Sequence, residues 1–249
     1  MGRALVSGLV RGNPDVAGAL AIADAVPAAV EAALGDAGGR AATLHEAAAA
    51  DLVCVAVKPK DAPDVLAQVA EGLRPGAVIL SVIAGWDLDR LSGAAPGAAI
   101  VRTMPNLAVR HGAGIVAVAS RGLDEGREAD VRALLAPLGA VVALPESLFA
   151  AATALAGSGP GLVAVVAEGL EEGAVAAGLS RAQAREMVAA VLAGTAALLS
   201  DGTDPATLRQ RVSSPAGTTI AGIAVLERGA VRAHVADAVQ AAARRAQEI

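Results

Sequence analysis

The sequence predicts an α/β fold in the first part of the chain and an all-helical fold in the second. Up to about residue 147, short runs rich in Val, Ile and Leu alternate with Ala-rich amphipathic stretches. This alternation is typical of strands joined by crossover helices in a parallel sheet. Beyond that point the β-branched runs stop and apolar residues recur at helical spacing. With 249 residues, 55% of them hydrophobic, the chain can bury a core in each of two domains.

The expected strands of the first domain, 1–147, are residues 19–23, 52–57, 77–82, 100–104, 115–119 and 140–144. Turn signals such as Lys58-Pro59 and Pro75-Gly76 separate them from the helices between. In the second domain, 148–249, Pro160 fits the first turn of a helix, since its missing N–H is not needed there. Ser180 and Gln183 have capping-box spacing, and Asp204 precedes a third helix.

Charge and composition exclude several classes of function. The chain has 20 basic and 25 acidic residues, a net charge of -5, and only Trp86 and Phe149 as aromatic residues. It therefore has neither the basic patch nor the stacking platform of a nucleic-acid-binding protein. The first residues lack the features of a signal peptide, and the longest unbroken apolar runs are shorter than the roughly 18 residues of a membrane helix. We expect a cytoplasmic protein that binds neither nucleic acid nor membrane.

Cysteine and histidine usage offers little chemistry. The single cysteine, Cys54, lies in the apolar run 52–57 and is either a small hydrophobe in a strand or a reactive thiol. His45, His111 and His234 are isolated from one another, so no metal site is expected. His111 lies beside a glycine turn and is either a residue near a site or an exposed loop histidine. No nucleophile elbow or P-loop motif is present.

Three features point to ligand binding. Asp24 lies 22 residues after Gly2, which precedes an expected helix at 4–10, and Asp24 ends an expected strand. A carboxylate at that spacing hydrogen-bonds a ribose 2′-hydroxyl and repels a 2′-phosphate, although a solvated loop aspartate is the simpler interpretation. Lys58 and Asn106 each follow an expected strand, where parallel sheets bind ligands, although a solvated loop residue is the alternative interpretation of Lys58.

The third feature is the hydroxyl-rich segment 212–219, which leads into an apolar helix. A helix N-terminus carrying several hydroxyl groups can bind a carboxylate or phosphate through its free N–H groups and its dipole. Ordinary capping of the helix by serine and threonine explains the same pattern. The residues alone leave both interpretations open.

Taken together, these motifs resemble the pyrroline-5-carboxylate reductase family. Residues 208–227, LRQRVSSPAGTTIAGIAVLE, are similar to the C-terminal signature of the family, and residues 154–160 are similar to its Ser-Gly-Ser-Gly-Pro helix start. Residues 56–59, 81–85 and 104–106 are similar to its three cofactor-side loops. The resemblance covers nearly the whole chain.

The resemblance implies a Rossmann-like domain followed by a helical domain through which two subunits form a homodimer; assembly up to a decamer is compatible with it. It implies reduction of 1-pyrroline-5-carboxylate to L-proline with NADPH or NADH. The implied substrate-binding residues are Ser213, Ser214, Gly217, Thr218 and Thr219, with Thr219 as the catalytic residue whose hydroxyl faces the ring nitrogen. The implied cofactor-binding residues are Gly2, Asp24, Ala56, Val57, Lys58, Pro59, Ile83, Ala84, Gly85 and Asn106.

The sequence departs from the family pattern in several places. The first strand and most of the glycine-rich loop are missing, so we expect the true start codon to lie upstream of Met1. Asp24 stands where many members have Ser, Thr or a basic neighbour, which favours NADH at least as much as NADPH. Ala216 replaces a glycine, so that backbone position must tolerate a Cβ. Leu107 and Ala108 replace a threonine and a proline.

Two other functions fit parts of the sequence. A Rossmann hydroxy-acid dehydrogenase would use a catalytic lysine in its helical domain, but Lys58 and Lys60 both lie in the first domain. A non-catalytic dimeric protein of the same fold would explain the missing glycine-rich loop.

Overall fold

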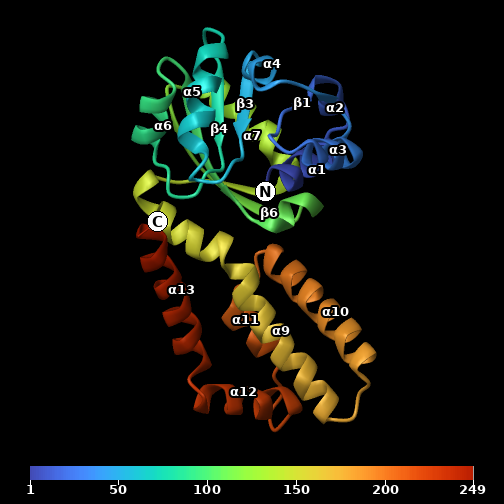
Figure 1. Ribbon diagram of the computed structural model, residues 1–249. Coiled ribbons are helices and arrows are strands. Elements are labelled where there is room, and N and C mark those ends of the chain that lie inside the picture. Colours follow the sequence, from blue (N-terminus) through green and yellow to red (C-terminus); the bar gives the residue numbers. More distant parts are fainter. Residues whose placement is uncertain (249) are drawn as a thin grey trace. The chain divides into compact units, whose positions relative to one another are not determined.

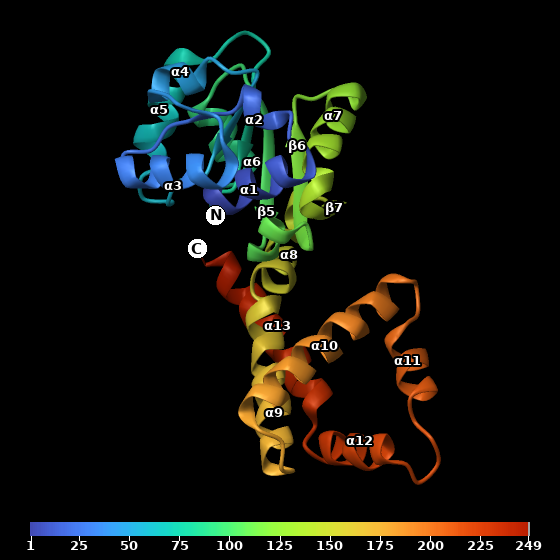
Figure 2. The same cartoon turned by 90° about the vertical axis from the view of Figure 1, so that its right-hand side faces the viewer.

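The computed structural model describes residues 1–248, and the chain divides into two compact units. The first comprises residues 1–157 together with the end of the last helix from residue 242, and the second comprises residues 158–241. Figures 1 and 2 show a sheet with flanking helices in the first unit and helices alone in the second. The sequence therefore predicted the class of each part of the chain.

The main sheet of the first unit has the order β3-β4-β5-β6-β7. These strands are β3 (Leu52–Val55), β4 (Val78–Ser81), β5 (Ala99–Pro105), β6 (Gly114–Arg121) and β7 (Gly139–Ala143). β3, β4 and β5 are parallel, but β6 pairs antiparallel with β5 and parallel with β7. The expectation of a purely parallel sheet was wrong at β6. Only the short 3-10 helix η1 (Leu107–His111) and a glycine turn join β5 to β6, and a parallel crossover needs a longer connection.

Helices cover both faces of this sheet. On one face, α4 (Leu44–Ala48), α5 (Ala62–Gly72), α6 (Leu88–Ala94) and α8 (Phe149–Ala152) supply the buried residues Ala48, Leu66, Leu91 and Phe149. On the other, α1 (Gly2–Gly12) and α7 (Glu125–Leu135) supply Leu5, Val131 and Leu135. The strands between them read as unbroken apolar runs because both of their faces are buried.

A second, two-stranded sheet stands apart from the first. β1 (Ala21–Ile22) pairs parallel with β2 (Arg40–Ala41), flanked by α2 (Val16–Ala19) and α3 (Pro27–Ala37), and no ladder joins β1 to β3 within residues 1–248. The Asp51 and Val55 carbonyls accept hydrogen bonds from the N–H groups of Val78 in β4 and of Val82 just after it, so Leu52 and Cys54 turn their main-chain groups to the opposite side. Among residues 1–248, β3 therefore has an unpaired edge on the side away from β4.

A connecting segment leads from β7 to the second unit. It contains the 3-10 helix η3 (Glu146–Leu148), α8 and a π-helical turn at Thr153–Gly157. Glu146 accepts hydrogen bonds from the Leu88 N–H at 2.7 Å and from the Arg102 guanidinium at 2.8 Å. The Arg102 guanidinium in turn lies over the Phe149 ring, 4.4 Å from its centroid. These contacts fix the connecting segment against the sheet.

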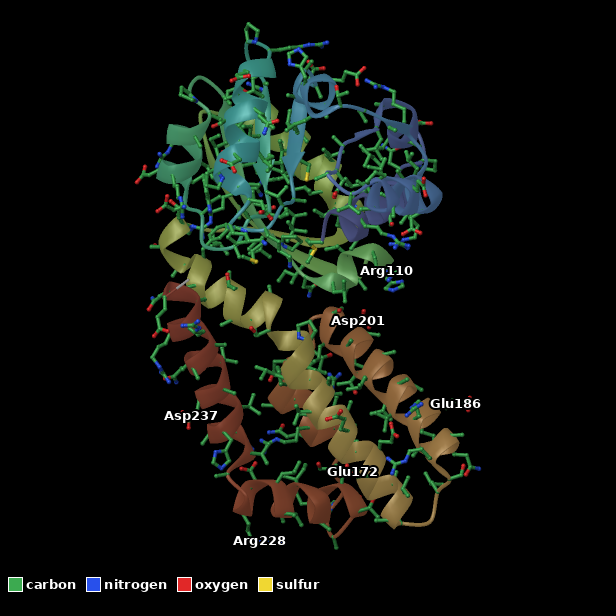
Figure 3. All side chains as sticks on the ribbon, viewed as in Figure 1. Arg110, Glu172, Glu186, Asp201, Arg228 and Asp237 are labelled. Atoms are coloured by element: carbon green, nitrogen blue, oxygen red, sulfur yellow. The ribbon has the colours of Figure 1, made fainter. Side chains whose placement is uncertain are left out.

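The second unit consists of α9 (Gly159–Ala176), α10 (Arg181–Ser200), α11 (Pro205–Arg211), α12 (Thr218–Arg228) and most of α13 (Val231–Gln247). The predicted starts of three of these helices are confirmed, since Pro160 lies in the first turn of α9, Ser180 caps α10 in a capping box and Asp204 caps α11. Charged residues such as Glu172, Glu186 and Asp237 point outward (Figure 3).

Large apolar side chains of this unit are also exposed, among them Val165, Leu170, Val191 and Leu226. Ala184 is its one buried apolar residue in the described part of α9 to α13. By length and composition alone, the stretch Glu146–Ala176 and the helix Arg181–Ser200 could each cross a membrane, with 17% and 11% of their apolar windows buried. A search for unbroken apolar runs missed them because a few charges interrupt them. Exposed apolar faces of this extent mark a surface that contacts a protein partner or a membrane.

Candidate active site

Three loops gather at the carboxyl ends of the parallel strands. Residues 56–59 follow β3, residues 83–85 follow β4 and Asn106 follows β5. Because adjacent parallel strands end at one edge of the sheet, the structure brings these sequence-predicted residues together. Lys58 is exposed and forms no ion pair with the described residues.

Buried hydrogen bonds hold two of these loops in place. The Ser81 hydroxyl accepts from the Ile83 N–H at 3.2 Å, and the Thr103 hydroxyl donates to the Ser81 carbonyl at 2.9 Å. The Asn106 N–H donates to the Ile115 carbonyl at 3.2 Å. Gly85 has a φ of 75°, which favours glycine at the turn after β4. These contacts tie the turns after β4 and β5 into the hydrogen-bond network of the sheet.

The N-terminus of α1 lies at the same edge. A Cβ built on Gly2 would lie 3.0 Å from the Ala56 Cβ, so the helix begins against the end of β3. The first bond of the helix runs from the Leu5 N–H to the Met1 carbonyl, and no side chain caps its first turn. Its leading N–H groups are thus available to an anion. Arg3, the second residue of α1, pairs with Asp36 of α3 and, by hydrogen bonding, lowers the pKa of that carboxyl.

Asp24 follows β1 and is exposed. Its Oδ1 accepts a hydrogen bond from the Val26 N–H at 2.9 Å, which makes a local turn. The second carboxylate oxygen accepts no hydrogen bond from the described residues. The turn explains why an aspartate stands there, while the free oxygen leaves it able to accept from a ligand hydroxyl.

This edge offers suitable groups for most parts of a dinucleotide. The exposed α1 N-terminus suits a pyrophosphate, Asp24 suits a ribose hydroxyl, and the loops after β3, β4 and β5 offer main-chain groups and an amide along the edge. Most of the expected glycine-rich loop before α1 is not represented among the described residues.

The second unit holds the hydroxyl-rich loop. After α11, the Ser213 hydroxyl donates to the Arg209 carbonyl at 2.7 Å, and the Gly217 N–H donates to the Ser214 carbonyl at 3.0 Å. Gly217 is the N-cap residue of α12, and no side chain caps this helix. Of the two interpretations left open by the sequence, capping by a serine or threonine side chain is therefore not seen, and the first N–H groups of α12, at Thr218 and Thr219, are available to bind an anion.

Other titratable groups contribute little to this chemistry. Cys54 is exposed at the free edge of β3, but desolvation by the surrounding chain raises the pKa of its thiol to about 11. The thiol is therefore neutral at physiological pH, which favours the small-hydrophobe interpretation. His111 is exposed in η1. No group of three or more metal-binding side chains occurs among residues 1–248.

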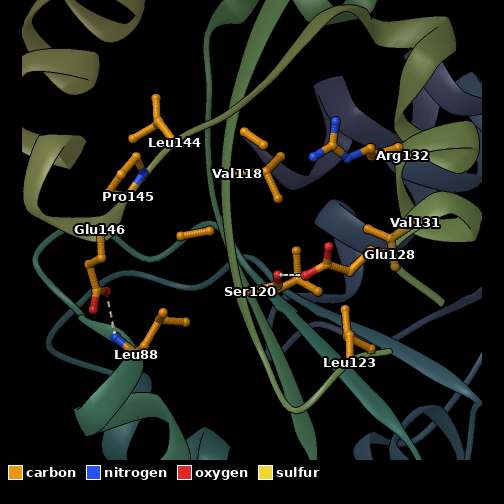
Figure 4. Close-up of a pocket in the computed structure, with 13 residues that line it drawn as sticks. Leu88, Val118, Ser120, Leu123, Glu128, Val131, Arg132, Leu144, Pro145 and Glu146 are labelled. Atoms are coloured by element: carbon orange, nitrogen blue, oxygen red, sulfur yellow. Dashed lines mark hydrogen bonds between the residues drawn. The ribbon is translucent and has the colours of Figure 1, made fainter. Parts of the chain in front are cut away.

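A separate pocket of about 410 Å³ opens at the opposite edge of the sheet (Figure 4). Val101, Val118 and Val131 line its apolar wall, and the Ser120 hydroxyl donates to Glu128 at its side. Its position, at the amino end of β5 and the carboxyl end of β6, separates it from the loops at Lys58 and Asn106. Sequence reasoning missed both this pocket and the Arg102–Glu146 pair, because their members lie far apart in the chain.

The fold and the two sets of residues define an oxidoreductase with a dinucleotide-binding domain and a helical dimerisation domain. A family model described as "NADP oxidoreductase coenzyme F420-dependent" matches residues 1–85, and one described as "Pyrroline-5-carboxylate reductase dimerisation" matches residues 146–249. The chain belongs to the pyrroline-5-carboxylate reductase family.

Curated relatives and a solved structure support that membership. The pyrroline-5-carboxylate reductase of Synechocystis is 41% identical over 202 residues, covering 80% of this chain and 75% of its own. That of Thermus thermophilus is 38% identical over 216 residues, covering 85% and 80%. The structure of the Coxiella burnetii pyrroline-5-carboxylate reductase superposes with a TM-score of 0.91 at 26% identity, covering 99% of this chain and 94% of that one.

Proposed function

We propose that the chain reduces 1-pyrroline-5-carboxylate to L-proline with a nicotinamide cofactor, the last step of proline biosynthesis. The observation that carries the proposal is the uncapped N-terminus of α12 beside Ser213 and Ser214, in a chain of this family. The free N–H groups at the start of α12, with the flanking hydroxyls, form a site for the substrate carboxylate.

Within this loop, Ser213, Ser214, Gly217, Thr218 and Thr219 bind the substrate, and Thr219 is the catalytic residue. Its hydroxyl hydrogen-bonds the ring nitrogen of the cyclic imine. The C=N carbon is electrophilic once that nitrogen is protonated, so holding the ring in one orientation replaces a strong acid. When bound, the cofactor supplies the hydride that this carbon receives.

In the first unit, Gly2, Asp24, Ala56, Val57, Lys58, Pro59, Ile83, Ala84, Gly85 and Asn106 bind the cofactor. Asp24 determines the choice between cofactors. Its free oxygen accepts from a ribose 2′-hydroxyl, whereas its charge repels a 2′-phosphate. NADH is therefore used at least as well as NADPH.

The functional domains are residues 1–147 and 148–249. The boundary between the compact units lies at residue 157, ten residues after this domain boundary, because Phe149 of the connecting segment packs in the core of the sheet. The helical domain forms a dimer, with assembly up to a decamer compatible, and its partner covers the apolar faces of α9 and α10. Burial between subunits explains why these two helices are so apolar without placing them in a membrane. The enzyme is soluble and cytoplasmic, and it binds no nucleic acid.

Steady-state assays with pyrroline-5-carboxylate and with small 2-hydroxy acids, each with NADH and with NADPH, test this function. Consumption of NADH that depends on pyrroline-5-carboxylate, without activity on the hydroxy acids, is expected. The second candidate, a non-catalytic dimer, is favoured by the open edge of β3. It predicts a folded dimer to which neither cofactor binds in a calorimetric titration.

A further inference from the structure

Ala216 adopts a left-handed backbone conformation in the middle of the loop, with a φ of 58°. It is the third residue of a β-turn, because the Gly217 N–H donates to the Ser214 carbonyl at 3.0 Å. Pro215, the second residue, has its φ fixed near about -65° by its ring. A turn of this kind is type II, which requires a positive φ at its third residue and usually has glycine there.

No side-chain hydrogen bond supports this conformation of Ala216 within the described part of the chain. An L-residue with a Cβ is disfavoured in the left-handed region, and alanine has no polar side chain with which to stabilise it locally. Ala216 is exposed, so packing does not hold it in place either. A type I turn keeps the same Ser214–Gly217 hydrogen bond with a negative φ at the third residue, and alanine favours that alternative.

The strained turn is directly coupled to the start of α12. A Cβ on Gly217 would overlap the Ser214 Oγ and would lie 3.1 Å from the Ser214 carbonyl oxygen. The Ser214 hydroxyl therefore lies against the residue that precedes the free N–H groups of Thr218 and Thr219. Rotation of the Pro215–Ala216 peptide changes the backbone that joins these two groups of the site.

We propose that Ala216 is a positioning residue that lowers the population of the binding-competent loop and thereby raises the KM for the substrate carboxylate. This inference rests on the proposed substrate site. A ligand that binds only one of two conformations has an apparent affinity reduced by the fraction in which that conformation is populated. Once substrate is bound the loop is already in the competent state, so kcat is not affected.

Ala216→Gly tests the proposal, and Ala230→Gly is its matched control. Ala230 is also an exposed alanine in the left-handed region, with a φ of 51°, but it follows α12 rather than preceding it. Both substitutions relieve the same backbone strain and add the same freedom to the unfolded chain. We expect A216G to lower the KM for pyrroline-5-carboxylate about fivefold with kcat within about twofold. A230G should leave both constants unchanged.

Ala216→Val provides the opposite perturbation, because a β-branched residue tolerates a positive φ less well. It should raise KM, whereas Ala230→Val should alter only the melting temperature. Equal KM values for wild type and A216G, a raised KM in A216G, or the same shift in A230G would each overturn the proposal.

Binding of L-proline, the carboxylate product, gives a readout that does not need turnover. Its concentration-dependent increase in melting temperature should be larger for A216G than for wild type and unchanged for A230G. If the wild type shows no turnover but A216G gains proline affinity, the proposed reaction fails and the role of Ala216 stands. If proline stabilises A216G no more than wild type, the role of Ala216 is wrong even where turnover is observed.

Discussion

The Ser214 hydroxyl occupies the space where Gly217 would carry a Cβ, and the Gly217 N–H donates to the Ser214 carbonyl at 3.0 Å. These two contacts close the turn before α12, and no side chain caps that helix. Gly217→Ala should therefore displace Ser214 and misplace the carboxylate site. We expect kcat/KM for pyrroline-5-carboxylate to fall about a hundredfold, as a misplacement of about 1 Å can produce.

The control for this substitution is Gly222→Ala, in the same helix, where a Cβ would meet no atom within 4 Å. It should leave kcat/KM unchanged. A similar loss in both variants would show that the effect comes from the helix rather than from the Ser214 contact.

Asp24 gives a prediction about the cofactor. Asp24→Asn keeps the side-chain oxygen that accepts from the Val26 N–H but removes the negative charge. The KM for NADPH should fall about tenfold, since about 1.4 kcal/mol of repulsion is removed. The control is Asp15→Asn, at an exposed aspartate that ends no strand, and it should leave the KM for NADPH unchanged. A wild-type enzyme with a strong preference for NADPH would contradict the role of Asp24.

Glu146 gives a prediction about stability. Glu146→Ala leaves the Arg102 guanidinium, whose side chain is only 14% exposed, without its carboxylate, and leaves the Leu88 N–H without an acceptor. Unfolding in urea should show a loss of about 2–4 kcal/mol. Asp89→Ala breaks the exposed Arg121–Asp89 pair of the same unit and should cost less than about 1 kcal/mol. Equal losses would refute a structural role for Glu146.

The Cys54 thiol gives a prediction about pH. Desolvation raises its pKa from the ordinary 9.0 to about 11, so the folded protein binds the thiol proton more tightly than the unfolded chain does. The resulting contribution to stability is complete below about pH 9 and is lost as the pH rises toward about 11. At about pH 7.5, alkylation of the native protein should be slower than in urea, because only the thiolate reacts. Equal rates would contradict the desolvation of the thiol.

Local sequence signals predicted most of the fold. The expected strands at 52–57 and 77–82 appear as Leu52–Val55 and Val78–Ser81, because dense apolar runs have few alternatives. β2 was missed, since two residues, Arg40 and Ala41, carry no strand signal. The antiparallel direction of β6 depends on the length of its connection rather than on its residues.

The site was less predictable than the fold. The sequence indicated the hydroxyl-rich segment but not the left-handed φ of Ala216, because a proline followed by alanine is compatible with a type I turn as well as with a type II turn. The hydrogen bonds that Glu146 accepts could not be predicted from the sequence, because the donors Leu88 and Arg102 lie 58 and 44 residues away. Contacts of that separation leave no trace in local composition.

The central claim is that the chain transfers hydride from a nicotinamide cofactor to the imine carbon of pyrroline-5-carboxylate, with Thr219 orienting the ring. The measurement that tests it most directly uses NADH deuterated at the transferring position and mass analysis of the proline formed. The account predicts one deuterium at the former imine carbon. It also predicts a rate about 10- to 100-fold lower in Thr219→Val, which loses a hydrogen bond to a charged group, and a largely retained rate in Thr219→Ser. Folded wild-type protein that forms no labelled proline, or a Thr219→Val variant as fast as wild type, would contradict it.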